Sequence, residues 1–334
     1  MSGIRVEKLA VFRGLYLGDL VAATPALRAL RRGYPRAEIT LVTLPWASAL
    51  APHLRDLIDR LLPYPGAPGL DGGGDEETLE DFLGRMRAER FDLAVNMHGR
   101  GPTSTDLVAR FGARRTAGFI GGERADVPAL DVAVPWDAET NESRKLLLLA
   151  EKAGGTPDGC EPELCVREDD YRQTDALLSE DLLRPLALVH PGASTPEKRW
   201  PGEGFSQVSE GLIQQGYTVA VTGSAAEEAL TRRVSDAAPG SLELGGKTNL
   251  SSLIALVARA SILVSNDTGP AHLAYALKTP SVTLFGPSTD AERWGPLFSD
   301  QHAVLRGNPI SDISVENVLR SAEALTVERE RVGA

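Results

Sequence analysis

ILVSNDTGPAHLAYALKTPSVTLFGPS, residues 262–288, contains the pattern that decides the fold. A short apolar run at 262–265 ends in a polar turn that opens a helix over 270–277, and a second apolar run follows at 281–285. Continuous apolar runs that alternate with helices are typical of parallel strands buried on both faces of a sheet. Because ligands bind beyond the carboxyl ends of such strands, we expect the polar turns after them to carry function.

The same alternation recurs through the rest of the chain. Further strands are expected at 8–12, 38–43, 91–97, 186–190 and 218–222, and helices at 20–32, 205–215, 225–237, 250–260 and 315–324. A Gly-, Pro- and acid-rich loop is expected at 63–77 and an interdomain segment at 156–170. The sequence therefore predicts an α/β protein of two doubly wound, Rossmann-like domains, 1–165 and 166–334, that face each other across a cleft. Whether the terminal helix packs back on the first domain stays open.

Composition limits the possible function classes. The chain has 334 residues, 42% of them hydrophobic, and a formal net charge of −11. Such acidity disfavours nucleic-acid binding and adhesion to anionic lipid. No apolar run approaches the roughly 20 residues that span a bilayer, and we expect no signal peptide. The only cysteines, Cys160 and Cys165, make neither a disulfide framework nor a good zinc site. We expect a cytoplasmic protein with at most peripheral membrane contact.

Asp19 ends the turn RGLYLGD that follows the first expected strand. The turn lacks the G-x-G-x-x-G spacing of dinucleotide-binding proteins, and a carboxylate near a helix start repels a phosphate. Asp is also a favoured helix cap. The alternative is a general base within reach of an acceptor hydroxyl. The turn alone leaves both interpretations open.

Two cations follow the first strand of the second half, in the segment HPGASTPEKRWP at 190–201. Small residues let backbone N–H groups approach an anion, and Lys198 and Arg199 supply positive charge for a diphosphate. An ordinary surface loop with solvated charges is the alternative.

The polar turn SNDTGPAH, quoted above, has the features of a phosphate site. Pro270 suits the first turn of a helix. The N–H groups of Thr268 and Gly269, together with the helix dipole, favour an anion. His272 lies one turn further on, where it can meet the same anion or simply pack inside the domain. Asp267 can contribute to the site or serve only as a cap.

A carboxylate after the strand at 218–222 is a candidate for ribose. Gly223 ends that strand, and Glu227 and Glu228 follow it. In nucleotide sites an acid near a strand end can bind the ribose hydroxyls. Exposed acids are common on helices, so a solvated surface is the alternative, and the choice between the two glutamates stays open.

Taken in order, these motifs resemble glycosyltransferase family 9, the heptosyltransferase family. Residues 17–19 with TPALR at 24–28 are similar to its N-terminal motif, and 191–201 with KRWP to the motif that opens its C-terminal domain. The most specific match is NDTGPAHLA at 266–274, continued by FGP at 285–287. The resemblance covers nearly the whole chain. It implies a GT-B fold that binds the acceptor in the first domain and the nucleotide sugar in the second.

The resemblance also assigns roles to residues. It implies that Asp19 is the general base and that Lys198 contacts the donor phosphates. The donor site that it implies comprises Ser194, Thr195, Arg199, Gly223, Glu227 or Glu228, Asp267, Thr268, Gly269 and His272. The acceptor site that it implies comprises Gly18, Asn96 and His98.

The implied reaction is a single displacement with inversion, in which Asp19 takes the proton of the acceptor hydroxyl. Lys198 and the helix start at Thr268 and Gly269 would stabilise the leaving diphosphate. Because we find no Asp-x-Asp turn placed for a metal, we expect turnover without a metal or other cofactor. The family implies ADP-heptose as donor. The acceptor is a lipopolysaccharide core sugar or a soluble secondary-metabolite intermediate. The alternatives are a non-hydrolysing sugar-nucleotide epimerase and a nucleotide-sugar-binding protein without turnover.

Overall fold

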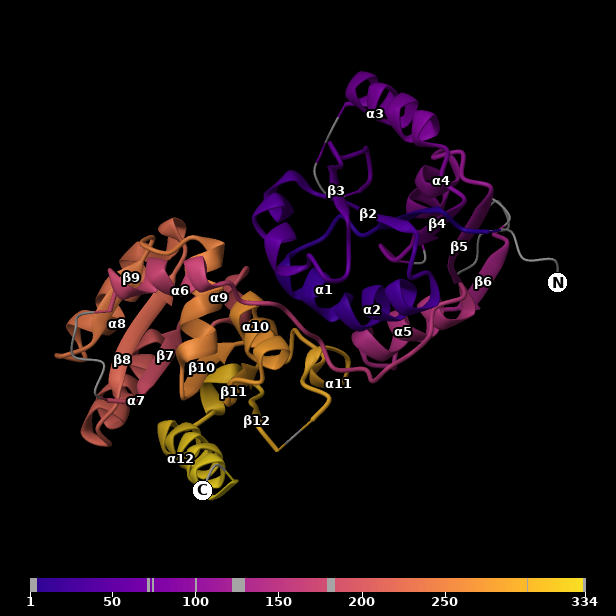
Figure 1. Ribbon diagram of the computed structural model, residues 1–334. Coiled ribbons are helices and arrows are strands. Elements are labelled where there is room, and N and C mark those ends of the chain that lie inside the picture. Colours follow the sequence, from indigo (N-terminus) through magenta and orange to yellow (C-terminus); the bar gives the residue numbers. More distant parts are fainter. Residues whose placement is uncertain are drawn as a thin grey trace. The chain divides into compact units, whose positions relative to one another are not determined.

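The computed structural model describes residues 5–70, 73, 75–99, 101–121, 130–178, 184–298 and 300–332, the side chains of 327–332 excepted. Residues 71, 72 and 74 of the expected loop 63–77 thus lie outside the described residues. The chain divides into two compact units, Met1–Cys165 and Val166–Ala334. Each unit contains one six-stranded sheet, drawn in indigo to magenta for the first unit and in red to yellow for the second (Figure 1).

The first unit is a parallel sheet with the strand order β3-β2-β1-β4-β5-β6. Its strands are β1 (Lys8–Phe12), β2 (Glu38–Thr43), β3 (Arg60–Pro63), β4 (Leu93–Asn96), β5 (Arg115–Ile120) and β6 (Val132–Pro135). Its helices are α1 (Leu17–Ala22), α2 (Thr24–Gly33), α3 (Glu76–Glu89), α4 (Pro102–Ala109) and α5 (Glu142–Lys152), with 3-10 turns at Pro45–Ala49 and Ala51–His53.

Helices cover the faces of this sheet because their apolar sides complete its core. On one face, α3 and α4 bury Phe82 and Leu107 against Phe12 of β1. Helices α2 and α5 pack together, and their approach is very close, since a Cβ on Gly33 would lie 2.2 Å from the carbonyl oxygen of Gly154. Larger residues at that point would force the two helices apart.

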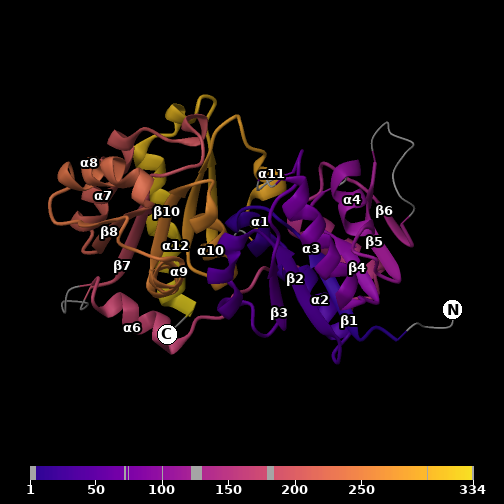
Figure 2. The same cartoon turned by 90° about the horizontal axis from the view of Figure 1, so that it is seen from above.

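The second unit repeats the architecture with the order β12-β11-β10-β7-β8-β9. Its strands are β7 (Leu186–His190), β8 (Thr218–Gly223), β9 (Leu242–Gly245), β10 (Ile262–Asn266), β11 (Ser281–Phe285) and β12 (His302–Arg306). Its helices are α6 (Glu168–Asp175), α7 (Gly202–Gln214), α8 (Glu228–Asp236), α9 (Leu250–Arg259), α10 (Gly269–Leu277), α11 (Ala291–Trp294) and α12 (Val315–Val332), with 3-10 turns at Pro196–Lys198, Ala225–Glu227 and Ile310–Asp312. The terminal helix α12 packs on α7 and on β10, β11 and β12 of its own unit (Figure 2).

The two sheets have the same topology. Counted within its own unit, each runs 3-2-1-4-5-6, the order of Rossmann folds. In such sheets the chain reverses its direction of travel between strands 1 and 4, and ligands bind beyond the carboxyl ends of these two strands. The topology therefore points to the turns after β1 and β4 in the first unit, and after β7 and β10 in the second.

The helix expected at 20–32 is instead two helices, α1 and α2, separated at Ala23. Pro25 occupies the first turn of α2, where its missing N–H costs nothing, but it cannot continue the hydrogen bonds of α1. Helix α1 starts at Leu17, three residues before the expected start, so that Asp19 lies in the first turn of a short helix.

Candidate functional site

Asp19 is both a helix cap and an accessible carboxylate. Its Oδ1 accepts from Nη2 of Arg13 at 3.2 Å, and its Oδ2 lies 3.4 Å from the backbone N–H of Tyr16. The side chain keeps 18% of its surface exposed. Gly18 precedes it in α1 and is half-buried. The two interpretations of the turn therefore do not exclude each other.

Arg13 is a site residue that the sequence reasoning missed. Only 1% of its side chain is exposed, although it is the first residue after β1. Its Nε donates to the carbonyl of Asp19 at 2.7 Å, and Nη1 donates to the carbonyl of Met97, beyond β4. Nη2 also contacts Oε1 of Glu142 at 3.2 Å. The guanidinium thus links the turns after β1 and β4 to the start of α5.

Glu142 and Lys145 continue this network on α5. Oε2 of Glu142 lies 3.0 Å from Nζ of Lys145, and these side chains are 5% and 2% exposed. Nζ of Lys145 also lies 3.9 Å from the centre of the Trp136 ring, at cation–π distance. Charges of alternating sign therefore run inward from Asp19 through Arg13 and Glu142 to Lys145.

His98 lies beside this network, beyond the end of β4. Its Nδ1 accepts from the N–H of Gly14 at 3.2 Å, and its ring stacks on Phe12 with centres 4.9 Å apart. Asn96 is fully buried, donates to Ser104 and Thr105, and accepts from the N–H of His98 at 3.0 Å. Asn96 is thus enclosed and helps to fix the position of His98.

In the second unit, Asn266 ties the turn after β7 to the end of β10. Its Oδ1 accepts from the N–H of Trp200 at 2.9 Å, and its Nδ2 donates to the carbonyls of Pro191 and Gly192. Arg199 shapes the same turn, since Nε and Nη2 both donate to the carbonyl of Ala193, at 3.1 and 2.8 Å. The sequence reasoning did not assign a role to Asn266.

Lys198 and His272 meet at the carboxylate of Asp267. Nζ of Lys198 lies 3.4 Å from Oδ2 of Asp267, and Nε2 of His272 lies 3.8 Å from Oδ1. Asp267 is 7% exposed, whereas Lys198 keeps 28% of its side chain exposed. Thr268 and Gly269 follow directly as the N-cap and first residue of α10. The structure therefore brings together five of the predicted donor residues at one helix start.

Glu227 and Glu228 have different surroundings. Oε2 of Glu227 accepts from the N–H and hydroxyl of Ser224, at 2.9 and 2.8 Å. Its carboxylate also reaches the turn after β7, because a Cβ on Gly192 would lie 2.1 Å from Oε1. Glu228 instead pairs with Arg232 one turn further along α8 and has a side chain that is 49% exposed.

Ser194 and Thr195 lie in the same turn after β7, and both are exposed. His190, at the end of β7, contacts the hydroxyl of Thr222 at 3.1 Å. Burial lowers the pKa of His190, while the nearby Glu227 carboxylate works in the opposite direction. Gly223 completes this corner, where a Cβ would lie 2.6 Å from Cγ2 of Thr231. Side chains larger than glycine would therefore clash at Gly192, in the turn after β7, and at Gly223, at the end of β8.

Aromatic side chains pack against one another along α10. His272 packs edge-on against Tyr275 and Trp294, and Tyr275 packs against His302 with ring centres 4.9 Å apart. The ring of His302 contacts the hydroxyl of Ser281 at 2.9 Å. Burial lowers the pKa of His302 to about 4.

This buried histidine predicts a loss of stability in mild acid. The unfolded chain protonates His302 near its ordinary pKa of 6.5, but the folded chain does so only near 4. Between these values the unfolded state binds the extra proton, so lowering the pH from 7 to 4 removes about 3 kcal/mol of stability. His302→Asn is expected to reduce this loss when urea unfolding is followed across that range. If the free energy of unfolding of the variant depended on pH as in the unaltered protein, His302 would not be the group responsible for the loss.

Other features of the described residues do not add to the site. No group of three or more His, Cys, Asp or Glu side chains is placed to hold a metal ion among them. No helix in the described ranges is long and apolar enough to cross a membrane. Both cysteines are free thiols, and Sγ of Cys165 donates to the carbonyl of Pro52 at 3.3 Å.

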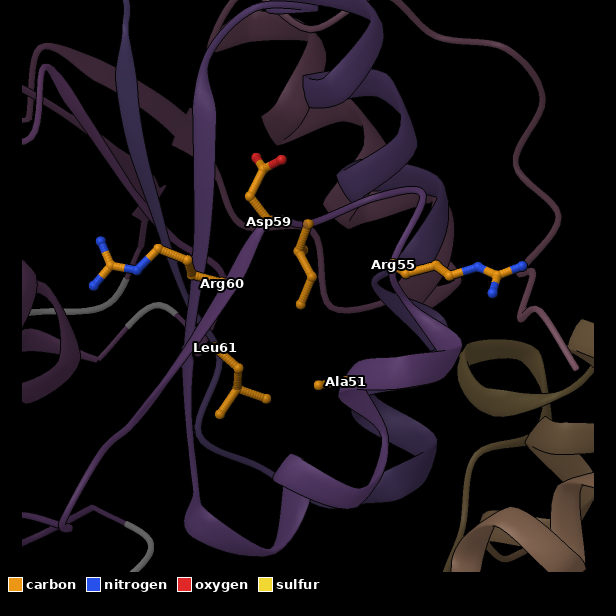
Figure 3. A pocket seen from close by; sticks show the side chains of 6 residues that line it. Ala51, Arg55, Asp59, Arg60 and Leu61 are labelled. Carbon is orange, nitrogen blue, oxygen red and sulfur yellow. The ribbon is translucent and has the colours of Figure 1, made fainter. Parts of the chain in front are cut away.

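A hollow of about 320 Å³ lies elsewhere in the first unit. Its lining consists of Ala51, Arg55, Ile58, Asp59, Arg60 and Leu61 (Figure 3). In Figure 3 the guanidinium groups of Arg55 and Arg60 point away from the hollow. Arg60 pairs with Glu38 and Glu89, and Asp59 pairs with an arginine of α2. Asp59 and Arg60 are therefore engaged in ion pairs, and none of the predicted site residues belongs to this lining.

Comparison with known proteins shows the family to which the chain belongs. The family model described as glycosyltransferase family 9 (heptosyltransferase) matches residues 81–319. Lipopolysaccharide heptosyltransferase 2 of Escherichia coli K12 is 28% identical, over 97% of this chain and 99% of its own. The crystal structure of a glycosyl transferase family 9 protein from Veillonella parvula superposes with a TM-score of 0.84 at 22% identity, covering 97% of this chain and 99% of that one.

The structure of the E. coli ADP-heptose lps heptosyltransferase II superposes with a TM-score of 0.80 at 23% identity, covering 97% of this chain and 99% of that one. These likenesses show the GT-B fold, as the sequence predicts. The predicted enzyme class, a glycosyltransferase, is confirmed as well. The chain belongs to glycosyltransferase family 9, the heptosyltransferase family.

Proposed function

We propose that this enzyme transfers a heptose, or a related sugar, from an ADP-sugar to an acceptor hydroxyl, with inversion and without a metal ion. One observation carries the proposal. Each unit carries part of the required chemistry beyond the carboxyl ends of its central strands. The first unit has the restrained but accessible carboxylate of Asp19. The second has the positive charge of Lys198 beside the start of α10.

On the acceptor side, Asp19 takes the proton of the attacking hydroxyl. The acceptor oxygen forms a bond to the anomeric carbon while the bond from that carbon to the diphosphate oxygen breaks. Positive charge develops on the sugar ring in the transition state, as at other glycosyl centres. Because this is one displacement from the face opposite the leaving group, the configuration inverts.

On the donor side, the diphosphate leaves with the bonding electrons and gains negative charge. Lys198 and the N–H of Gly269 stabilise that charge, reinforced by the dipole of α10. Asp267 keeps Lys198 and His272 in place. These groups supply the positive charge that a metal ion provides at other diphosphate sites, which supports metal-independent turnover.

The ribose of the donor is assigned to Glu227. Its carboxylate lies at the junction of the turns after β7 and β8, whereas that of Glu228 points to solvent and pairs with Arg232. The exposed hydroxyls of Ser194 and Thr195 border the same turn and are proposed as further donor contacts.

The acceptor is assigned to the edge of the first unit around Asp19. His98 and Gly18 would contact it there, and Asn96 would position His98. Two aromatic side chains follow neighbouring strands at this edge, Tyr16 with 68% and Trp46 with 37% of its surface exposed. Exposed aromatic faces can pack on apolar faces of a ligand.

We propose a lipopolysaccharide core sugar as the acceptor, with the enzyme in the cytoplasm and at most in peripheral contact with the membrane. The similarity to lipopolysaccharide heptosyltransferases 2 and 3 of Escherichia coli supports this acceptor. The net charge of −11 supports a weak rather than a tight association with anionic lipid.

The donor assignment is tested by thermal-shift measurements with ADP, UDP, GDP and dTDP in the absence of metal. A nucleotide at 100 times its Kd stabilises the folded chain by about 2.7 kcal/mol, which is readily detected. We expect selective stabilisation by ADP. Selective stabilisation by another nucleotide would contradict the ADP donor.

The two glutamates provide a matched pair in the same assay. Glu227→Gln is expected to weaken ADP binding by a factor of about 10 to 100, because a hydrogen bond to a charged group contributes about 1.5–3 kcal/mol. Glu228→Gln is expected to change ADP binding by less than about twofold, because exposed ion pairs contribute little. The reverse order would contradict the assignment of Glu227 to the ribose.

A further inference from the structure

We propose that Arg13 is a positioning residue for sugar transfer, which holds the carboxylate of Asp19 where it can take the proton of the acceptor, and that Glu142 in turn holds Arg13. This inference rests on the proposed role of Asp19 as the base. It adds to the reaction a residue pair that is 129 positions apart in the sequence.

The contacts of Arg13 fix Asp19 at two points. Nε donates to the backbone carbonyl of Asp19 at 2.7 Å and Nη2 to its Oδ1 at 3.2 Å, so both the first turn of α1 and the side chain are restrained. Nη1 donates to the carbonyl of Met97, which anchors the guanidinium to the turn after β4. Within the part of the chain that the structure describes, the contact of Asp19 Oδ2 is the 3.4 Å one to the N–H of Tyr16, and we assign the proton of the acceptor to this oxygen.

The burial of the network points to function rather than to stability. The side chains of Arg13, Glu142 and Lys145 are 1%, 5% and 2% exposed, and only Asp19, at the end of the series, reaches 18%. Removing charges from water is costly, and well-packed apolar residues often stabilise a fold as well or better. If Asp19 acted only as a helix cap, a buried network of charges behind it would not be needed, because a cap stabilises a helix start through its own hydrogen bond. Of the two carboxylates in this network, that of Asp19 is the more exposed one, and it lies at the end of the series.

A lysine could not replace this guanidinium. Arg13 contacts two carbonyls and two carboxylates, which lie in different directions around one planar group. A lysine ammonium carries its charge on a single nitrogen and cannot span these acceptors. Arg13→Lys therefore keeps the charge but loses the geometry, while Glu142→Gln keeps the shape and loses the charge that holds Arg13.

A double-mutant cycle tests the proposal. We would measure kcat for the unaltered enzyme, Arg13→Lys, Asp19→Asn and the double variant, with ADP-heptose and acceptor at saturation. Arg13→Lys is expected to lower kcat by about 10², the cost of misplacing a reacting group by about 1 Å. In the Asp19→Asn background the same substitution is expected to change kcat by less than about threefold, because effects that pass through one residue are not additive.

If the role of Arg13 were merely structural, Arg13→Lys would lower kcat by the same factor in the unaltered enzyme and in Asp19→Asn, and that result would overturn the proposal. A kcat for Arg13→Lys within twofold of normal would overturn it as well. Glu142→Gln is expected to behave like Arg13→Lys, and it provides the test if Arg13→Lys does not fold. Arg60→Lys is the matched control, because Arg60 also pairs with two carboxylates in the first unit, away from Asp19. A near-normal kcat in Asp19→Asn alone would instead disprove the proposed base, which is a distinguishable outcome.

Discussion

Asp19→Asn is expected to lower kcat by a factor of about 10² to 10⁴, the usual contribution of a positioned general base. The amide keeps the shape of the side chain and can still approach Arg13, but it cannot accept the proton of the attacking hydroxyl. ADP release from ADP-heptose, measured with saturating acceptor, reports the loss. The Kd for ADP is expected to stay unchanged, since the proposed nucleotide contacts belong to the second unit.

Asp92 provides the matched control for Asp19. It is another carboxylate of the first unit, but it accepts from the N–H groups of Glu7 and Lys8, at the amino ends of the strands. Asp92→Asn is expected to leave kcat within about twofold of normal, because the loss of its hydrogen bonds to Glu7 and Lys8 lowers stability but does not touch the proposed site. A kcat for Asp19→Asn close to that of the unaltered enzyme would remove Asp19 from the mechanism.

Lys198→Met is expected to lower kcat by about 10² to 10³, the usual effect of removing one group that stabilises developing negative charge. The substitution also removes the lysine that pairs with the buried carboxylate of Asp267, next to the proposed position of the diphosphate. Weaker ADP binding is therefore expected together with slower turnover. Steady-state kinetics combined with titration of ADP measures both effects.

Lys247→Met separates this effect from a general loss of charge. Lys247 pairs with Glu243 at 2.7 Å in the same unit, and 55% of its side chain is exposed. Its replacement is expected to change kcat by less than about twofold, since exposed ion pairs contribute little. Equal losses in the two variants would show that Lys198 has no specific role at the diphosphate.

Among the described strands, none of the four edge strands was predicted from the sequence, and the internal strand β5 was missed as well, whereas the other seven were predicted. The strands β1, β2, β7, β8, β10 and β11 are nearly continuous runs of buried residues, because helices cover both of their faces. By contrast β3, β6 and β12 are short and largely half-exposed or exposed. Such segments lack the apolar run that distinguishes a buried strand from a loop.

The local parts of the site could be predicted in the same way. Asp267, Thr268, Gly269 and His272 lie together because one strand–turn–helix segment carries them. The partners that hold these groups come from distant segments and leave no local signal. Glu142 reaches Arg13 across 129 positions, and Asn266 reaches Trp200 across 66. The sequence does place one charged residue, Arg13, directly after the buried strand β1, and this position indicates that its side chain has a specific partner.

The choice between Glu227 and Glu228 illustrates the same limit. Adjacent acids on a helix start have equal propensities, so spacing cannot separate them. The structure gives them different surroundings, because the carboxylate of Glu227 lies against Gly192 in the turn after β7, whereas Glu228 pairs with Arg232. The assignment therefore depends on packing between segments and not on the motif itself.

Product analysis tests the central claim most directly. The enzyme would be incubated with ADP-heptose, a lipopolysaccharide inner-core acceptor and EDTA, and the products identified by mass spectrometry and NMR. We predict ADP and heptosylated acceptor in equal amounts, with a new glycosidic bond whose anomeric configuration is opposite to that of the donor. An epimerised donor, or a bound donor that remains unchanged, would contradict sugar transfer to this acceptor, and a bond of retained configuration would contradict the single displacement at Asp19.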